Sequence, residues 1–142
     1  MSTVRKTLFL LAVLAATSTA APQPTYRLVA SRANPVASLP RAEAARMFLK
    51  KVTSWADGRP VAAIDQERNS PVRQAFSRDV HQRDADSIAA HWQTLVFAGR
   101  DVPPPIAKSD AEVLAFVRAN PGAIGYVSGD VDVEGVKVLT LR

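Results

Sequence analysis

Apolar and polar residues follow two different periods along the chain, and these periods predict strands and helices in turn. Residues 26–30, Tyr-Arg-Leu-Val-Ala, alternate with a period of two and predict a first strand. Residues 41–51 repeat apolar side chains at helical spacing, which predicts a helix that starts beside Pro40. The turn-forming pair Asp57-Gly58 then leads into the apolar run Val61–Asp65, which predicts a buried strand.

The second half of the chain predicts three more helices and two more strands. Ser70, Asp84 and Ser109 are expected N-caps, because their side chains accept hydrogen bonds from first-turn N–H groups. The expected elements are helices from residue 71 to about 81–83, from 85 to about 97 and from 110 to about 119, strands over 123–127 and 136–139, and an extended, proline-rich connector over 100–107. Strands that alternate with helices predict an α/β fold with a mixed, largely parallel sheet flanked by helices.

The first twenty residues have the pattern of a secretory signal peptide. Arg5 and Lys6 are basic, Leu8–Ala16 is uniformly apolar, and residues 18–20 are small, as at a cleavage site before Ala21. The apolar run is shorter than the roughly 20 residues that span a bilayer. We therefore expect residues 1–20 to be removed and residues 21–142 to form one exported, soluble, periplasmic domain without stable membrane insertion. The alternative is an uncleaved N-terminal anchor.

The cysteine content and net charge of the chain limit the kinds of cross-link, anchor and partner that it can have. The chain has no cysteine, which excludes disulfides and the thiol that a lipid-anchored export signal requires. Removing Arg5 and Lys6 from the 18 basic residues leaves 16 against 13 acidic ones, a net charge of about +3. The basic residues are spread along the chain without interleaved aromatic residues, so no nucleic-acid partner is expected.

The candidate binding site is the turn between the Val61–Asp65 strand and the helix that Pro71 begins. A capped helix start beyond the carboxyl end of a strand points unpaired N–H groups and the positive end of the helix dipole at the same place, which suits a small anion. Many such turns bind nothing. Asp65, at the end of the strand, is interpreted as fixing the following loop through side chain–backbone hydrogen bonds, with a general base as the alternative.

The chain shows no convincing catalytic or metal-binding motif. His81 and His91 are the only histidines, and their spacing is not that of metal ligands. Neither a nucleophile-elbow nor a phosphate-loop motif is present. We therefore predict no catalytic residue, no metal and no cofactor, that is, a protein that is not an enzyme. A hydrolase that uses Asp65 and one histidine is a minor alternative.

Several short segments in fixed order resemble one known family. They are Ser38–Glu43, Met47–Leu49, Trp55–Gly58, Val61–Asp65, Ser70 with Phe76, Phe97–Gly99, Ser109–Val113 and Asn120–Val127, the last containing Pro-Gly-Ala-Ile-Gly-Tyr-Val. Together they resemble the phosphate-binding proteins of ABC transporters, of the type 2 periplasmic binding protein class, and in particular its small, single-lobe members. The resemblance covers roughly residues 28–127.

The resemblance implies an α/β lobe that grips an oxyanion with hydroxyls and helix-start N–H groups. Ser70 matches the serine that opens the family's Ser-Gly-Thr anion loop. Pro71 and Val72 stand where that loop has glycine and threonine, and Gln66 stands where full-length relatives have an arginine. Either of two nearby cations, Arg68 or Arg73, is hypothesised to compensate, because Arg pairs well with oxyanions.

Two functions follow as hypotheses. In the first, the exported protein binds phosphate or a similar small oxyanion and delivers it to the permease of an ABC transporter. Its predicted ligand-binding residues are Gln66, Arg68, Asn69, Ser70, Val72 and Arg73. In the second, the lobe has lost its ligand and serves as an interaction or accessory module that contacts another protein of the cell envelope.

Overall fold

The computed structural model describes Thr17 and residues 25–142. The predicted signal segment, residues 1–20, therefore lies almost entirely outside the described residues. The strands are β1 (Tyr26–Ser31), β2 (Ser38–Leu39), β3 (Ala62–Ala63), β4 (Asp65–Gln66), β5 (Ile106–Ala107), β6 (Ala123–Ser128) and β7 (Val136–Leu141). The helices are α1 (Arg41–Phe48), α2 (Pro71–Phe76), the π-helical turn η1 (Ser77–His81), α3 (Ala85–Phe97) and α4 (Asp110–Ala119).

Five strands form the main sheet in the order β2-β7-β1-β6-β3, and β4 pairs with β5 in a second, two-stranded sheet. The long central strand β1 pairs antiparallel with both β6 and β7, with Leu28 opposite Tyr126 and Leu139. The two-residue edge strands β2 and β3 pair in parallel with β7 and β6. The predicted α/β fold with a mixed sheet is confirmed, and its parallel pairs lie at the borders while its centre is antiparallel.

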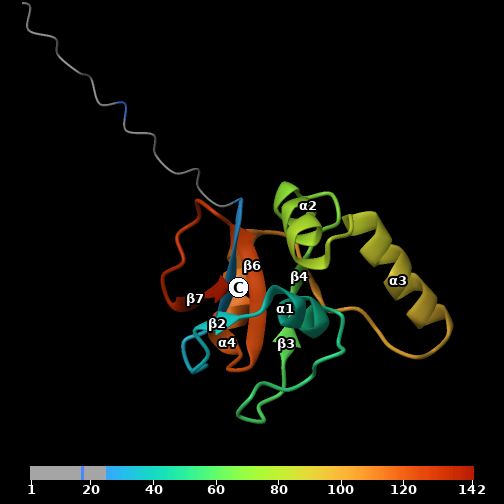
Figure 1. The fold of residues 1–142 in the computed structure, drawn as a ribbon, viewed down its shortest axis with the longest axis horizontal. Coiled ribbons are helices and arrows are strands. Elements are labelled where there is room, and N and C mark those ends of the chain that lie inside the picture. The colour runs from blue at the N-terminus through green and yellow to red at the C-terminus, as the bar shows by residue number, and fades with distance from the viewer. Residues whose placement is uncertain (1–16, 18–24) are drawn as a thin grey trace, which may run out of the picture.

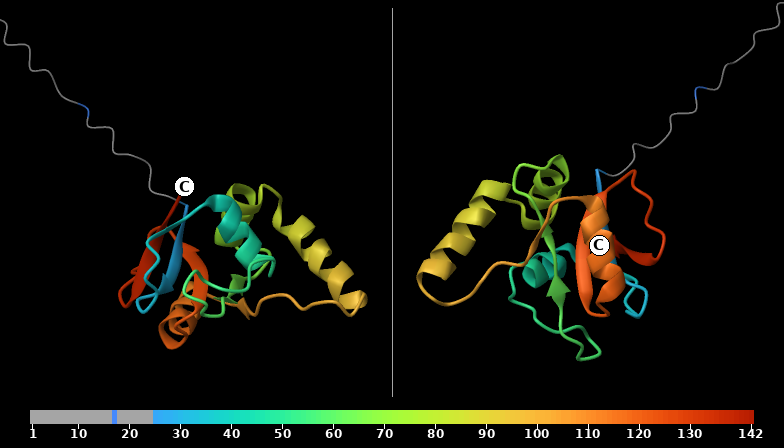
Figure 2. Two further views of the ribbon diagram at one scale, coloured as in Figure 1. Left: turned by 60° about the horizontal axis from the view of Figure 1, so that its bottom comes forward. Right: turned by 180° about the vertical axis from the view of Figure 1, so that it is seen from behind.

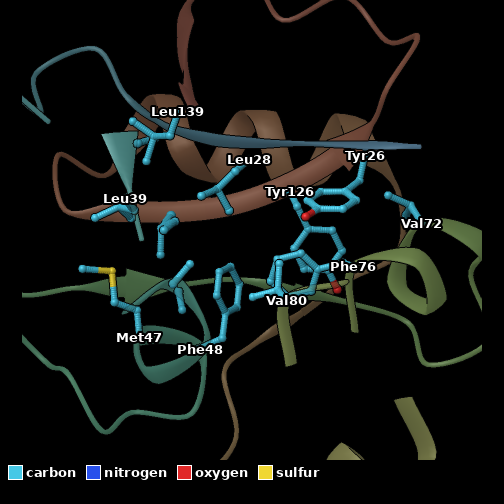
Figure 3. Packing of buried hydrophobic residues seen from close by; sticks show 14 of the residues in the cluster. Tyr26, Leu28, Leu39, Met47, Phe48, Val72, Phe76, Val80, Tyr126 and Leu139 are labelled. Carbon is cyan, nitrogen blue, oxygen red and sulfur yellow. The ribbon is translucent and has the colours of Figure 1, made fainter. Parts of the chain in front are cut away.

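One face of the main sheet is covered by α1, α2 and η1. Alternate residues of β1 and β6 (Tyr26, Leu28, Ala30, Ile124 and Tyr126) pack here against the helices, as the period of two along a strand requires. Aromatic side chains fill the centre of this cluster, where Phe76 stacks on Tyr126 with ring centroids 3.8 Å apart and Phe48 packs edge-on against Phe76 at 4.8 Å. Figure 3 shows these rings gathered between the sheet and α1.

The other face of the main sheet is covered by α4, which lies in front of the strands when the molecule is seen from behind (Figure 2). Val113, Leu114 and Val117 of α4 pack here against residues of β1 and β6. At Gly125 a Cβ atom would lie only 2.7 Å from Val113 Cγ1, so the absence of a side chain lets the helix approach the strand. The layers are therefore helix, sheet, helix.

The helix α3 stands at the periphery of the molecule in every view (Figures 1 and 2). Its buried residues are Ala85, Ile88 and Trp92, all in its first eight positions. Asp84 caps it as predicted, accepting a hydrogen bond from Ser87 N–H at 2.7 Å, and Gly99 follows its end with a positive φ of 66°. The second half of α3 leaves the body of the protein.

Candidate functional site

The turn from β4 to α2 has the local structure that the sequence predicts. Ser70 is the N-cap of α2, its Oγ accepts a hydrogen bond from Arg73 N–H at 3.2 Å, and Pro71 occupies the first helical position. A proline there loses nothing, because the N–H that it lacks would have no partner within the helix. The cap fixes the direction in which the helix leaves the turn, and so it places Arg73.

Most backbone donors at this helix start are already engaged within the chain. Ser70 N–H donates to Glu67 O at 3.0 Å, Arg73 N–H donates to the Ser70 cap, and Pro71 has no N–H. Val72 keeps an N–H in the first turn, while its side chain is buried in the core. The tip of α2 thus offers one backbone donor and the Ser70 hydroxyl rather than the row of free N–H groups that an anion loop presents.

Arg73 points into the protein and pairs with Asp65. The two side chains are 5% and 4% exposed, and Arg73 Nη1 lies 2.8 Å from Asp65 Oδ1. Nη1 also donates to Gln66 O at 2.8 Å, and Nε donates to Ser77 Oγ at 3.3 Å. The charge that the sequence suggested for an oxyanion is therefore largely satisfied by a carboxylate and two oxygens of the same chain.

Tyr126 and Gln66 complete this buried polar cluster. Tyr126 O–H donates to Asp65 Oδ1, and Gln66 Nε2 donates to Asp110 Oδ1 and to Tyr126 O, both at 2.9 Å. Burial raises the pKa of Asp65, while Arg73 and the two hydrogen-bond donors Tyr126 O–H and Gln66 N–H offset part of that rise. Burial, followed by the charge of Asp65, also raises the pKa of Tyr126. Gln66 thus links β4 to α4 and β6 through its buried amide.

Sequence reasoning placed Asp65 correctly but missed two members of this cluster. The hydrogen bond from Gln66 N–H to Asp65 Oδ1, at 3.0 Å, is the loop-fixing contact that was expected of the carboxylate. The sequence marks Tyr126 and Asp110 only as parts of a strand and of a helix start. No local signal connects them to Asp65, because they are 61 and 45 residues away along the chain.

Arg68 and Asn69 are exposed in the turn. Arg68 Nε lies 3.3 Å from Asp86 Oδ1, with side chains that are 57% and 77% exposed. A pair this exposed is screened by water and contributes little to stability. Of the predicted site residues, Arg68 is the cation that solvent reaches.

A groove of about 590 Å³ separates α3 from the turn and from the connector that leads to β5. We call it the α3 groove, and its lining residues are Asp65, Glu67, Arg68, Asn69, Arg73, Ala89, Trp92, Gln93, Val96, Phe97, Pro103 and Ile106. One end is polar and holds three of the six predicted site residues, Arg68, Asn69 and Arg73. The other end is apolar. Gln66, Ser70 and Val72 do not line it, so the structure brings only half of the predicted set into one cavity.

The histidines do not join the Asp65 cluster. The His81 ring packs edge-on against Phe76, with centroids 5.5 Å apart. Burial, together with the charges of Arg73 and Arg83, lowers the pKa of His81 to about 4. Asp65 is held by Arg73, Tyr126 and Gln66 instead, an arrangement that fixes structure rather than one that poises a base beside a histidine. In the described part of the chain, no three His, Asp or Glu side chains are grouped as metal ligands.

No family model matches the sequence, and no curated protein matches it. Solved structures do match. An ABC-type phosphate transport receptor from Vibrio cholerae has a TM-score of 0.64 at 21% identity, over 82% of this chain and 46% of the receptor. A protein assigned as a phosphate ABC transporter substrate-binding protein from Clostridium perfringens, solved with bound phosphate, has a TM-score of 0.64 at 23% identity, over 82% of this chain and 44% of that protein.

These comparisons define the class of fold. The chain has the fold of one lobe of phosphate ABC transporter substrate-binding proteins, and it spans less than half the length of the two solved structures. The predicted resemblance is thereby confirmed at the level of the fold. Within residues 25–142, none of the helices is both long and apolar enough to pass through a bilayer.

Proposed function

We propose that this chain is an interaction module of the cell envelope, built on one lobe of the binding-protein fold, that contacts a partner protein through the α3 groove. The observation that carries the proposal is the internal ion pair of Arg73 with Asp65, at 2.8 Å and almost fully buried. An oxyanion would have to compete with the Asp65 carboxylate, which already pairs with Arg73. In this proposal the lobe keeps its fold, and its predicted anion-binding arginine bonds groups of the same chain instead of a ligand.

The electrostatics of the groove support the same proposal. Its charged lining consists of two carboxylates, Asp65 and Glu67, and two guanidinium groups, Arg68 and Arg73. These charges balance, so the groove has no net positive field with which to attract an anion.

The apolar end of the groove suits a protein partner. Phe97 is 87% exposed, Val96 47% and Ile106 50%, although burial is the usual state of such side chains. Large apolar side chains gathered at one exposed place are typical of interaction surfaces. An inorganic anion makes no use of them. This is the surface on which we expect the partner to dock.

The proposed location is the periplasm. Its support is the basic, apolar and small-residue pattern of residues 1–20, together with the absence of cysteine, which fits an exported domain stabilised by its core alone. A partner would then be another exported or membrane-anchored protein of the envelope. A nucleic-acid partner stays unsupported, since the groove carries no basic stripe.

A photo-crosslinking amino acid introduced at Phe97 in living cells tests the proposal. The matched control carries the same group at Val138, which is 41% exposed on β7 and outside the α3 groove. We expect a discrete cross-linked species from position 97 and not from position 138, in equal amount with and without phosphate in the medium. Cross-linking that is the same at both positions, or that is absent at 97, contradicts the proposal.

Binding of phosphate or a related oxyanion is the second candidate. Its support is the polar end of the groove, which Arg68, Asn69 and Arg73 line, together with the Ser70 hydroxyl and the Val72 N–H at the neighbouring helix start. Gln66, with both its amide hydrogens donated within the chain, would take part only through a rearrangement. In this role the chain would deliver the anion to an ABC permease, and with one lobe it would hold the anion partly hydrated and weakly.

Isothermal titration calorimetry with phosphate, sulfate and phosphonates tests this second candidate. Binding is expected to be abolished by Arg68→Gln and unchanged by Arg100→Gln, a control that removes an exposed arginine outside the groove. Both substitutions remove the same charge from the whole protein, so a general electrostatic effect would appear in both. The absence of heat with every anion at millimolar concentration removes oxyanion binding and leaves the interaction module standing.

A further inference from the structure

The helix α3 is attached to the rest of the protein chiefly through the π-helical turn η1. Among the described helices and strands, η1 is the one against which α3 packs most. The buried residues of α3, Ala85, Ile88 and Trp92, belong to neither of the two core clusters that cover the sheet. Figure 1 shows α3 standing away from the sheet. The position of α3 therefore depends mainly on its contact with η1.

A short connection joins η1 to α3. It consists of residues 82–84, which we call the hinge. Gln82 has a φ of 53°, in the left-handed region that a residue with a side chain adopts only at a cost in energy. Conformational changes in proteins are commonly taken up by a few such residues at the end of an element. The hinge is thus a place where α3 can change its direction relative to η1.

The two histidines of the chain lie on the two elements that this contact joins. His81 ends η1, and His91 belongs to α3. His81 Nδ1 and His91 Nε2 are both buried, and neither has a hydrogen-bond partner in the described part of the chain. The two rings pack edge-on against Phe76 and Trp92, with centroids 5.5 and 5.3 Å apart. A neutral imidazole tolerates such surroundings, whereas an imidazolium needs acceptors or water for both its N–H groups.

The charged groups that face His81 are cations. They are Arg73 of α2 and Arg83 of the hinge, and His91 of α3 adds a further positive charge whenever it is protonated. Burial and these charges together lower the pKa of His81 to about 4. Arg73 is held in its place by the buried Asp65 carboxylate. A proton on His81 therefore adds a charge to a cluster of like charges.

The carboxylates closest to His81 along the chain are engaged with other groups. Asp79 accepts a hydrogen bond from Tyr26 O–H and lies 3.3 Å from Arg41 Nε. Asp84 is the N-cap of α3 and accepts its hydrogen bond from the first turn of that helix. Neither carboxylate is among the groups whose charge acts on His81. No nearby acid thus compensates a protonated His81.

His91 has a similar setting on the other element. Burial, together with the charges of Lys51 and Arg83, lowers the pKa of His91. Arg83 therefore acts on both histidines, from the hinge between their two elements. The contact between η1 and α3 favours the neutral form of each imidazole.

Water can reach a protonated His81 most easily if α3 moves. On its other side His81 contacts Phe76, which is fully buried and stacks on Tyr126 in the core under the sheet. Displacing Phe76 would disrupt that core. Displacing α3 opens only a local contact, and local openings cost less free energy than unfolding of the core.

We propose that α3 is released by acid: uptake of a proton by His81, assisted by His91, separates α3 from η1 about the hinge. The inference goes beyond the proposed function and does not depend on it, because it concerns the attachment of α3 whatever the α3 groove binds. Since α3 forms one wall of the α3 groove, its release would also change the shape of that groove.

The direction of the pH dependence follows from linkage. Once α3 has left, His81 is hydrated and regains the ordinary histidine pKa of 6.5, so the released form binds the proton more tightly than the attached form. Release is therefore favoured progressively as the pH falls from 6.5 towards 4. Between pH 7 and pH 5 the equilibrium constant for release should rise about 20-fold.

Amide hydrogen exchange of the purified protein tests this inference, with each rate expressed relative to an unstructured peptide at the same pH. Residues 88–92 of α3 should lose about 20-fold in protection between pH 7 and pH 5. Low concentrations of urea should leave that protection nearly unchanged, because a local opening exposes little surface. Residues 113–117 of α4, whose exchange requires unfolding of the body, should lose protection steeply with urea.

Three substitutions assign the effect to the proton on His81. His81→Gln should reduce the change in protection of residues 88–92 to less than about 3-fold. Arg83→Gln, which removes an exposed cation that faces His81, should also make the change smaller, and it provides the test if His81→Gln does not fold. Arg100→Gln, which removes the same charge from an exposed position beyond the end of α3, should leave the 20-fold change as it is.

Three results would overturn the release of α3 by acid. The first is equal protection of residues 88–92 at pH 7 and pH 5 in the unmodified protein. The second is a full 20-fold change in His81→Gln. The third is the same dependence on urea for residues 88–92 and 113–117, because the proton would then act only through unfolding of the whole body.

Discussion

Asp65 and Arg73 show that the role of a charged residue depends on the groups that it contacts. Each would be expensive to bury alone, and together they are buried at 4% and 5% exposure with a 2.8 Å contact and further hydrogen bonds. Such a pair contributes little net stability relative to an apolar pair. Removing only one of the two side chains is costly, because the charge that remains is buried without water or a partner.

Arg73→Met should therefore destabilise the protein by about 3–5 kcal/mol. The loss should be smaller at pH 5 than at pH 8, since without the cation Asp65 can relieve its burial by taking up a proton, which the lower pH favours. Urea unfolding at both pH values measures this. Adding Asp65→Asn to Arg73→Met should recover part of the loss, and Arg68→Met, at the exposed pair, should cost at most about 1 kcal/mol. Equal losses of stability in Arg73→Met and Arg68→Met would contradict the assignment of Arg73 to a buried ion pair.

His81 gives the protein a stability that depends on pH. Its pKa is lowered to about 4 in the folded protein from 6.5, so on acidification the unfolded chain takes up the proton first. The contribution of the neutral His81 imidazole to the free energy of unfolding is complete above pH 6.5 and is lost as the pH falls towards 4. About 2 kcal/mol of the free energy of unfolding is lost between pH 7 and pH 5. His81→Gln should remove this part of the pH dependence of unfolding, while His91→Gln should retain it. An unchanged pH dependence in His81→Gln would show that the imidazole is not buried as described.

At the scale of single residues, the sequence predicts what depends on neighbours along the chain. The Ser70 cap and the loop-fixing contact of Asp65 with Gln66 lie within a few residues, and both are found in the structure. The partner of Arg73 was not predictable, because a capped helix start is compatible with an arginine turned outwards to a ligand or inwards to the core. The β4–α2 turn decides it, by bringing Asp65 opposite Arg73.

Elements differ in how firmly they are attached to the body, and α3 is the least attached of the long helices. Its buried residues end at Trp92, whereas α4 buries Val113, Leu114 and Val117 along one continuous stripe. Backbone hydrogen bonds in an uncovered helical turn open locally without unfolding the rest of the protein. The free half of α3 should therefore open more readily than α4.

Amide hydrogen exchange measures this difference. The amides of residues 93–97 should exchange much faster than those of residues 113–117. Equal protection of both segments would mean that α3 is held by contacts other than those of its first half.

The sequence predicts helices in this protein better than it predicts short strands. The bounds of α3, residues 85–97, agree with the expectation, since a cap and a terminal glycine mark them locally. The expected strand over residues 61–65 is divided between β3 and β4, which belong to different sheets, and β2 and β5 were not foreseen. Two-residue strands exist only through distant partners, such as Ala107 for Gln66. The helix that Pro71 begins continues as a π-helical turn from Ser77 to His81, which the sequence did not predict.

At the scale of the whole molecule, two cores share one sheet. Residues of β1 and β6 supply both the cluster under α1 and α2 and the cluster under α4. Loss of either helical layer exposes one face of the same central strands. The two cores are thus coupled through the backbone hydrogen bonds of β1 and β6.

Unfolding of the main body should therefore be cooperative. The chain has two tryptophans, and Trp55 is 3% exposed with its indole N–H donating to Gly122 O at 2.9 Å. In Trp92→Phe, urea midpoints from Trp55 fluorescence and from far-ultraviolet circular dichroism should coincide. Midpoints that differ would reveal that the two helical layers unfold in separate steps.

The architecture of the molecule was predictable because ordered segments spanning residues 28–127 resemble a known lobe, and solved structures confirm that fold. The arrangement of the strands was only partly predictable. Alternation of strands and helices suggests parallel pairing. However, most of the chain separates β1 from β6 and β7, which leaves their relative direction open, and β1 pairs antiparallel with both. The α3 groove was not foreseen, since it forms between segments that are separate in the sequence.

The borders of the main sheet have a consequence for how the protein can meet its neighbours. Both outermost strands, β2 and β3, are only two residues long, so each presents too few backbone groups to template an incoming strand. Growth of the sheet from molecule to molecule, the route by which exposed strands seed fibrils, is thereby discouraged. The exposed apolar end of α3 can then contact another protein through its side chains without extending the sheet.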